Sequence, residues 1–196
     1  MSVSSQNLSQ AAFEQAPNEG SNRPIWLVPA LHWMMAALII TAFIIGKNME
    51  DLPRDQRLSV LGWHILVGLS VLGLFLPRII AVIANSRIAT AKTGRVQDKA
   101  NFAAWIMQGI LYVLMLAIPL TGLTAMTTIG RNFPVLGLFS LPNFANNHQL
   151  HEVMEGIHGT MATVMIILAG LHGVAALWHH FVLKDDVLRR YLPGKG

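Results

Sequence analysis

Four histidines lie in long apolar stretches that contain no Asp or Glu: His32, His64, His158 and His172. An ionisable side chain at membrane depth is costly and rare, so each of these residues needs a reason. Proton pathways usually combine histidine with carboxylates, whereas neutral imidazoles in apolar helices are typical of axial ligands to haem iron. We therefore predict that these four histidines coordinate haem iron.

Long apolar helices must position these histidines. Stretches without Lys, Arg, Asp or Glu cover residues 25–46, 58–77, 100–130 and 156–183, and about 20 apolar residues suffice to cross a bilayer. We predict an all-α integral membrane bundle of four transmembrane helices, at about residues 25–46, 58–83, 101–126 and 154–183. The helices of a soluble bundle would show polar faces, which these stretches lack.

The chain divides into one membrane domain and two short tails. Residues 1–22 are rich in Ser, Gln, Asn and Ala and have neither the basic start nor the apolar run of a signal peptide. We predict a disordered cytoplasmic tail over residues 1–22, a membrane domain over 23–193 and a C-terminal tail over 194–196.

The distribution of Lys and Arg predicts the orientation. With four spans, both termini and the middle loop share one side of the membrane. That side carries ten of the 14 basic residues, and the other side carries Lys47, Arg54, Arg57 and Arg131. The positive-inside rule therefore places both termini in the cytoplasm, and the basic pI near 9.9 needs no nucleic acid as a partner.

This topology sorts the histidines into two depths. His158 and His172 are 14 residues apart, which puts them on one helix face, about 40° out of alignment and about 21 Å apart along the axis. His64 begins the second helix on the outer side, level with His158. His32 lies on the inner side of the first helix, level with His172. The sequence thus predicts two bis-histidine sites and two haems.

Two alternatives for these histidines stay open. Some could be core residues that bond to a neighbour. A zinc or copper site would need three or four ligands at one depth, and only two are found at each. Small residues that would admit a flat macrocycle, but that also serve plain helix packing, flank three of the histidines: Gly62, Gly68, Gly159, Gly170 and Gly173.

Other polar residues have weaker claims to a function. Arg78 ends the second apolar stretch and serves either as a positive-inside anchor or as the partner of an inner haem propionate. His179 and His180 lie at the inner membrane edge, as interfacial residues or as hydrogen-bond partners of a propionate or a quinone. We expect His148 and His151 to be solvated in a long outer loop that forms a surface cap with a helical turn.

Composition excludes several kinds of protein. Apolar residues make up 53% and charged residues 12% of the 196 residues, about half the charge of a soluble domain. The chain has no cysteine, which excludes disulfides, thiolate zinc sites, iron–sulfur clusters and covalently attached c-type haem.

These features resemble those of the prokaryotic cytochrome b561 family of four-helix dihaem membrane cytochromes. The resemblance runs from about residue 25 to 193. Its matching pieces are LHW at 31–33, LGWHILVG at 61–68, LPRII at 76–80, AIPLTGL at 117–123, GIHGTMA at 156–162 and, most specifically, GLHGVAALWHHFVLKDDVLRRYLP at 170–193. It implies two haem b groups, one ligated by His32 and His172 and the other by His64 and His158. Some relatives carry a histidine at the start of the third helix, where this chain has Trp105 and Gln108, so no ligand is assigned there.

The resemblance implies an oxidoreductase of the bacterial inner membrane that exchanges electrons with ubiquinone. Some members of the family are similar to superoxide oxidases, which would make this chain a superoxide:ubiquinone oxidoreductase in contact with membrane lipid. A site with two histidine ligands leaves no open coordination position, which favours outer-sphere electron transfer. The alternatives are a haem-carrying anchor subunit that relays electrons between a partner dehydrogenase and quinone, and a non-redox transporter or scaffold.

Overall fold

The computed structural model describes residues 26–49, 51–93 and 102–184, so the predicted tails at 1–22 and 194–196 lie outside the described residues. It contains the helices α2 (Leu27–Met49), α3 (Arg54–Thr93), α4 (Phe102–Thr127) and α5 (His148–Trp178), and α5 continues into a short π-helix, η2 (His179–Leu183). Four helical segments are long and apolar enough to cross a membrane, namely Leu27–Met49, Asp55–Ala84, Phe102–Thr127 and His148–Leu183. The predicted all-α membrane bundle is confirmed.

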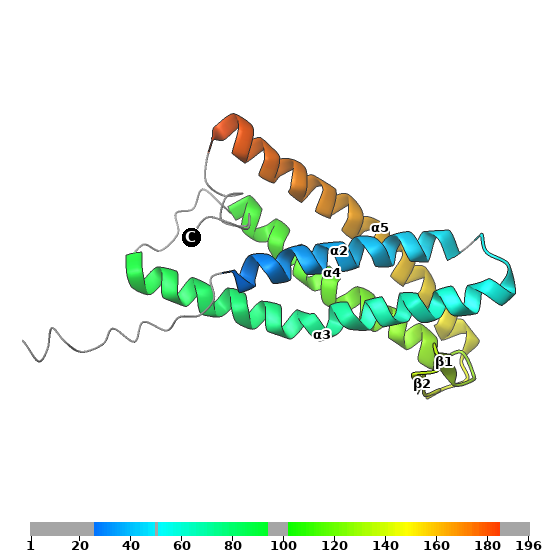
Figure 1. The fold of residues 1–196 in the computed structure, drawn as a ribbon. Helices are drawn as coiled ribbons and strands as arrows, with labels where there is room; N and C mark the ends of the chain where they lie inside the picture. The colour runs from blue at the N-terminus through cyan, green and yellow to red at the C-terminus, as the bar shows by residue number, and fades with distance from the viewer. Residues whose placement is uncertain (1–25, 50, 94–101, 185–196) are drawn as a thin grey trace, which may run out of the picture.

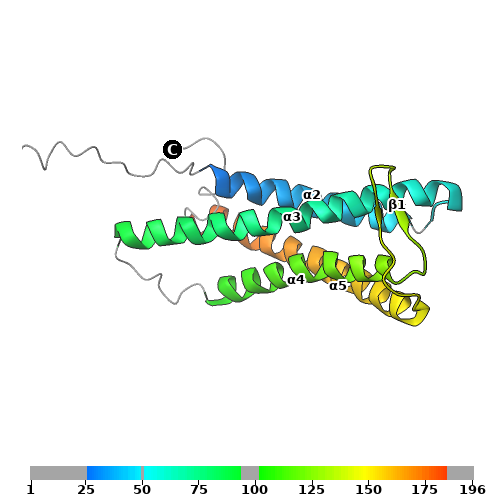
Figure 2. The same cartoon turned by 90° about the horizontal axis from the view of Figure 1, so that it is seen from below.

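The helices form two antiparallel pairs (Figures 1 and 2). Helix α2 packs along α3, and α4 packs along α5, whereas α2 and α5 touch at few positions. Figure 1 shows the C-terminal end of α5 diverging from the other helices. Large apolar side chains cover the outside of the bundle, among them Ile40, Ile80, Val113 and Ile167, as expected for surfaces that face lipid.

The interior is a narrow apolar column. Its middle is a cluster to which each helix contributes: Met35 from α2, Val71 from α3, Leu114 and Met115 from α4, and Met165 from α5. Met35 is only 1% exposed and Met165 only 4%. Because lipid is as apolar as these side chains, close packing rather than water exclusion holds this contact together.

Two helices are longer than their apolar stretches. Helix α3 begins at Arg54 and extends to Thr93, ten residues beyond the predicted end at residue 83. Helix α5 begins at His148 rather than at 154, because the Asn147 side chain caps it by accepting a hydrogen bond from the Leu150 amide at 3.0 Å. Charges delimit the part of a helix that lies in lipid, but the helix itself continues until its backbone groups find another partner.

The segment that connects α4 to α5 forms a two-stranded antiparallel sheet, whereas we expected a surface cap with a helical turn. Strand β1 (Phe133–Val135) pairs with β2 (Phe139–Leu141). Phe133, Val135 and Leu141 are buried against Ile65 of α3 and Met126 of α4. The β-hairpin therefore closes one end of the bundle, which we call the hairpin end (Figure 2).

The turn of this hairpin has an unusual first residue. Leu136 and Gly137 both have positive φ, 51° and 74°, and the Leu138 amide donates to the Val135 carbonyl at 2.9 Å. Two such residues are the requirement of a type I′ turn, which favours Asn-Gly. A left-handed leucine costs about 1–2 kcal/mol. Its side chain compensates by packing on Gly62, where an added Cβ would lie 2.9 Å from Leu136 Cδ2.

We predict that Gly62→Val loosens the hairpin. Overpacking of this kind typically costs about 1–3 kcal/mol, which corresponds to at least about a fivefold larger population of the opened hairpin. Trypsin cleavage after the exposed Arg131 should accelerate accordingly. The control is Gly73→Val on the same helix, where a Cβ would meet nothing within 4 Å. Equal cleavage rates in both variants would refute this role of the Leu136–Gly62 contact.

Candidate functional site

Two of the four predicted histidines meet near the hairpin end. His64 of α3 and His158 of α5 have ring centroids 5.8 Å apart, with an angle of 79° between the ring planes. Both side chains are half-buried. We call them the hairpin-end pair. Their meeting across two helices is the arrangement expected from their matched depth.

Backbone carbonyls fix the tautomer of both rings. His64 Nδ1 lies 3.0 Å from the Ala42 carbonyl of α2, and His158 Nδ1 lies 2.8 Å from the Ile118 carbonyl of α4. Because a carbonyl oxygen can only accept, each Nδ1 must carry the proton. The Nε2 of the neutral ring then keeps its lone pair and is free to bind a metal. Partners of this kind orient the histidine ligands of metal sites.

A glycine gives each ring access to its carbonyl. Gly46 follows Ala42 by four residues, and an added Cβ there would lie 3.1 Å from His64 Cε1. Gly122 follows Ile118 by four residues, and its added Cβ would lie 2.9 Å from both Cε1 and Nδ1 of His158. In both helices the glycine stands one turn after the accepting carbonyl, where a side chain would displace the imidazole.

The sequence did not indicate these two glycines, because they are not next to a histidine along the chain. The glycines that it indicated lie beside the histidines. An added Cβ at Gly68, Gly159, Gly170 or Gly173 would meet nothing within 4 Å. The useful signal was a glycine on a neighbouring helix at the depth of a histidine. That signal requires knowing which helices are neighbours, which the sequence leaves open.

The other two histidines meet toward the opposite end of the bundle. His32 of α2 and His172 of α5 have ring centroids 6.5 Å apart, with an angle of 65° between their planes. We call them the opposite-end pair. His32 Nδ1 lies 3.0 Å from Nη2 of Arg78. A guanidinium can only donate, so His32 Nδ1 accepts here. In the hairpin-end pair, by contrast, the Nδ1 atoms of both histidines donate.

Arg78 lies inside the bundle. It is only 6% exposed, and its Nε and Nη1 are buried without a hydrogen-bond partner among the described residues. Its guanidinium carbon lies 5.7 Å from the ring centre of Tyr112 on α4. Burying a charged side chain without a partner is costly, and positive-inside anchoring by itself does not require this burial.

Helix α5 contributes to both pairs from one face. His158, Met165 and His172 follow one another at intervals of seven residues, which keeps them within about 40° around the helix. Met165 packs in the central apolar cluster. The two pairs therefore lie on either side of that cluster, at two levels of one bundle.

Neither pair extends to a larger ligand set. Within residues 26–49, 51–93 and 102–184, no three His, Cys, Asp or Glu side chains gather where they could hold a metal ion. This is unlike the three- and four-ligand sites that zinc and copper occupy. Each pair suits a metal centre that brings its own equatorial ligands and needs one nitrogen from each side.

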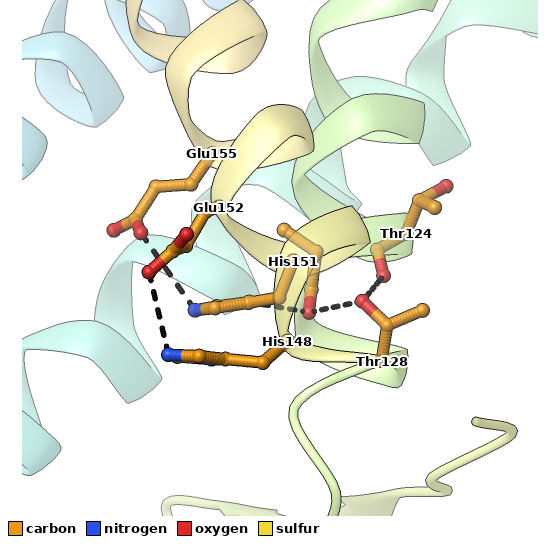
Figure 3. A network of polar contacts seen from close by, with 7 residues as sticks. Thr124, Thr128, His148, His151, Glu152 and Glu155 are labelled. Carbon is orange, nitrogen blue, oxygen red and sulfur yellow. Dashed lines mark hydrogen bonds and ion pairs between the residues drawn. The ribbon is translucent and has the colours of Figure 1, made fainter. Parts of the chain in front are cut away.

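The remaining histidines lie outside both pairs. At the start of α5, His148 is exposed and its Nε2 lies 3.3 Å from Glu152. His151 was also expected to be solvated, but its side chain is 15% exposed and its Nδ1 lies 2.8 Å from the Ala125 carbonyl. Thr128 donates to the Thr124 and Ala125 carbonyls, at 2.9 and 3.1 Å, so this network satisfies the last turn of α4 (Figure 3).

The two histidines after α5 stand in the π-helix η2. His180 Nδ1 is buried and has no hydrogen-bond partner among the described residues, and the His180 ring packs edge-on against Phe181 at 4.9 Å. Short π-helical segments are frequent at functional sites. In the part of the chain that the structure describes, no hydrogen bond or ring contact joins His180 to either pair.

Comparison with known proteins gives a consistent result. The family model of prokaryotic cytochrome b561 matches residues 25–194. The chain is 26% identical over 167 residues to the probable superoxide oxidase CybB of Yersinia pestis, which covers 84% of this chain and 93% of the relative. It is 31% identical over 168 residues to cytochrome b562 of Cereibacter sphaeroides, covering 83% and 90%. It is also 35% identical to cytochrome b561 homolog 1 of Escherichia coli over 91 residues, 46% of this chain and 52% of the relative.

The family match covers all four helices and both histidine pairs, so the resemblance seen in the sequence motifs is confirmed. The chain therefore belongs to the prokaryotic cytochrome b561 family of membrane proteins that bind b-type haem.

Proposed function

We propose that this protein is a dihaem cytochrome that carries electrons across the bacterial inner membrane. One haem b would be held by His64 and His158, and the other by His32 and His172. The observation that carries this proposal is the occurrence of two histidine pairs at two levels of one bundle, with ring centroids 5.8 and 6.5 Å apart.

The residues fit this cofactor. Metal–nitrogen bonds of about 2 Å put two imidazoles on opposite sides of one metal ion with their centroids about 6 Å apart, close to both spacings. At the hairpin-end pair, the Ala42 and Ile118 carbonyls leave each Nε2 available. At the opposite-end pair, Arg78 offers two unpartnered donors to an anionic substituent. When bound, the haems supply one-electron chemistry at the two levels.

The protein residues would hold, orient and separate the two redox sites. Each pair of imidazoles would hold one haem through two nitrogens, which would favour outer-sphere electron transfer over binding of O₂. The backbone carbonyls fix the orientation of two of these rings. The cluster around Met35 and Met165 excludes water between the two levels, and the hairpin covers the end of the bundle beside His64.

We further propose superoxide as the electron donor and ubiquinone as the acceptor. Each superoxide gives up one electron and leaves as O₂, and two such electrons with two protons convert quinone to quinol. The name of the Yersinia pestis relative supports this substrate. The Lys and Arg distribution supports a hairpin end outside the cytoplasm and cytoplasmic termini, so superoxide would react at the hairpin-end pair.

The second candidate is a haem-carrying anchor subunit that relays electrons between a partner dehydrogenase and quinone. It is favoured by relatives whose names specify a cytochrome without a substrate, such as cytochrome b562. The two candidates differ in one property, because only the oxidase reduces its haem from superoxide without a partner protein.

The haem assignment is tested by single replacements in α5. The purified protein should contain two haems per chain. His158→Ala and His172→Ala should each retain one, because each histidine serves a different pair. Haem is quantified from reduced-minus-oxidised spectra. His148→Ala, which removes an exposed histidine of the same helix, is the control and should retain two. Two haems in either pair variant would contradict the assignment.

The glycine beside His158 gives a second test. Gly122→Ala should lower haem content toward one per chain, because the added Cβ would meet the His158 ring at 2.9 Å. Glycine to alanine within a helix otherwise stabilises by about 1 kcal/mol, so a loss here cannot come from helix propensity. Gly109→Ala is the matched control on α4. It lies 13 residues away, about 140° around the helix, and its Cβ would meet nothing within 4 Å.

Superoxide should reduce the purified haem protein with a rate that depends weakly on salt. Residues 47–57 carry three basic and three acidic side chains, and the next outer segment carries Arg131 together with Glu152 and Glu155, so no broad positive field is expected. Stopped-flow reduction should fall less than about tenfold between about 0.01 and 0.5 M salt, where the Debye length shrinks from about 30 Å to a few Å.

The outcomes of this measurement separate the candidates. A steeper fall would reveal local steering by a positive patch and contradict the weak-steering prediction. If superoxide does not reduce the haem at any salt concentration, the oxidase proposal is refuted and the anchor subunit is favoured. A stable protein that holds no haem would support the non-redox alternative.

A further inference from the structure

We infer that Arg78 changes partners when haem binds, from His32 to a haem propionate, and that it makes the opposite-end haem the better electron acceptor of the two. This inference rests on the proposed function, because it assumes that His32 and His172 hold that haem.

The first step concerns the proton on His32. Arg78 Nη2 lies 3.0 Å from His32 Nδ1, and since the guanidinium can only donate, the proton of the neutral ring sits on Nε2. An iron ligand must offer a lone pair at the nitrogen that binds. If His32 binds iron through Nε2, its proton must move to Nδ1. Nδ1–H and Arg78 Nη2 are then two donors that face each other without an acceptor. The Arg78–His32 hydrogen bond and ligation through Nε2 therefore exclude each other.

The second step concerns the partner that replaces His32. Arg78 is 6% exposed, and its Nε and Nη1 already lack partners among the described residues. The acidic residues of the described helices are Asp55, Glu152 and Glu155, all toward the hairpin end. Arg78 is 23 positions after Asp55 on α3, roughly 35 Å along the helix. No described carboxylate can reach it, whereas each haem b brings two propionates, which suit the planar fork of a guanidinium.

The third step concerns redox potential. A buried positive charge stabilises the reduced, less positive state of a nearby iron. If Arg78 pairs with a propionate, it instead cancels an anion that would favour the oxidised state. Both arrangements raise the potential of the opposite-end haem. At the hairpin-end pair, the imidazoles bond to the neutral carbonyls of Ala42 and Ile118, which make the imidazoles more basic and lower the potential.

Arg78 is thus a positioning residue that biases electrons from the hairpin end toward the opposite end. Tyr112 lies against it, with its ring centre 5.7 Å from the guanidinium carbon and its hydroxyl buried without a described partner. This contact keeps the guanidinium between α3 and α4, beside the opposite-end pair.

The test is a spectroelectrochemical titration of the purified haem-loaded protein. The His158→Ala background, which keeps only the opposite-end haem, assigns that haem's transition. Arg78→Gln should shift this transition to lower potential and leave the other haem unchanged, and Arg78→Lys, which keeps the charge, should shift it less. Arg131→Gln, which removes an exposed arginine at the hairpin end, is the control and should leave the opposite-end potential unchanged. Two haems with unchanged potentials in Arg78→Gln would overturn the inference.

A second measurement applies even where Arg78→Gln cannot hold its haem. Haem-free His158→Ala protein is reconstituted with haem b or with its dimethyl ester, which lacks free carboxylates. Arg78 should favour the free acid by about tenfold, the ratio that a hydrogen bond between charged groups supplies. Equal affinity for both would overturn the partner change. Failure of the proposed function would give a different result. The wild type would then contain fewer than two haems, or His172→Ala would still contain both.

Discussion

The structure depends on one constraint, which is the need of a buried imidazole for a hydrogen-bond partner at Nδ1. In an apolar bundle no water meets that need, and the transmembrane segments offer few polar side chains. For His64 and His158, the partner is a backbone carbonyl on a neighbouring helix. A glycine one turn after the accepting carbonyl leaves room for the ring, and Gly46 and Gly122 stand in these positions. The histidines therefore dictate which helices are neighbours and at what height.

The same constraint explains the uneven packing of the helices. α2 packs on α3, and α4 on α5, but α2 and α5 touch at few positions. The two helix pairs are joined directly between α3 and α4, where Arg78 lies against Tyr112. They also meet at the two histidine pairs and through the Met35–Met165 cluster. A group that binds between the rings would therefore add to the stability of this interface. Haem loading and bundle stability are then expected to rise together.

Much of this arrangement could be predicted from the sequence, because charge and hydropathy act along a single chain. They gave four spans, and the depth of each histidine followed from its distance to the nearest charge. The partners Ala42, Ile118, Gly46 and Gly122 could not be predicted, since they depend on the rotation of one helix against another. The hairpin was missed because its Leu136-Gly137 turn lacks the usual Asn-Gly signal. Arg78 was ambiguous, because a charge that ends an apolar stretch reads as a surface anchor even when it is only 6% exposed.

The difference between the two pairs follows from where polar groups can be placed along α3. His64 and Arg78 are 14 residues apart on this helix, the same interval that separates His158 and His172 on α5, so α3 brings an imidazole to one level and a guanidinium to the other. On helix α2, the Ala42 carbonyl bonds to His64, and His32 bonds to Arg78. The imidazoles of one level thus bond to neutral carbonyls, whereas His32 at the other level bonds to a cation. If each pair holds a haem, as we propose, this difference between His64 and Arg78 along α3 would give electrons a preferred direction.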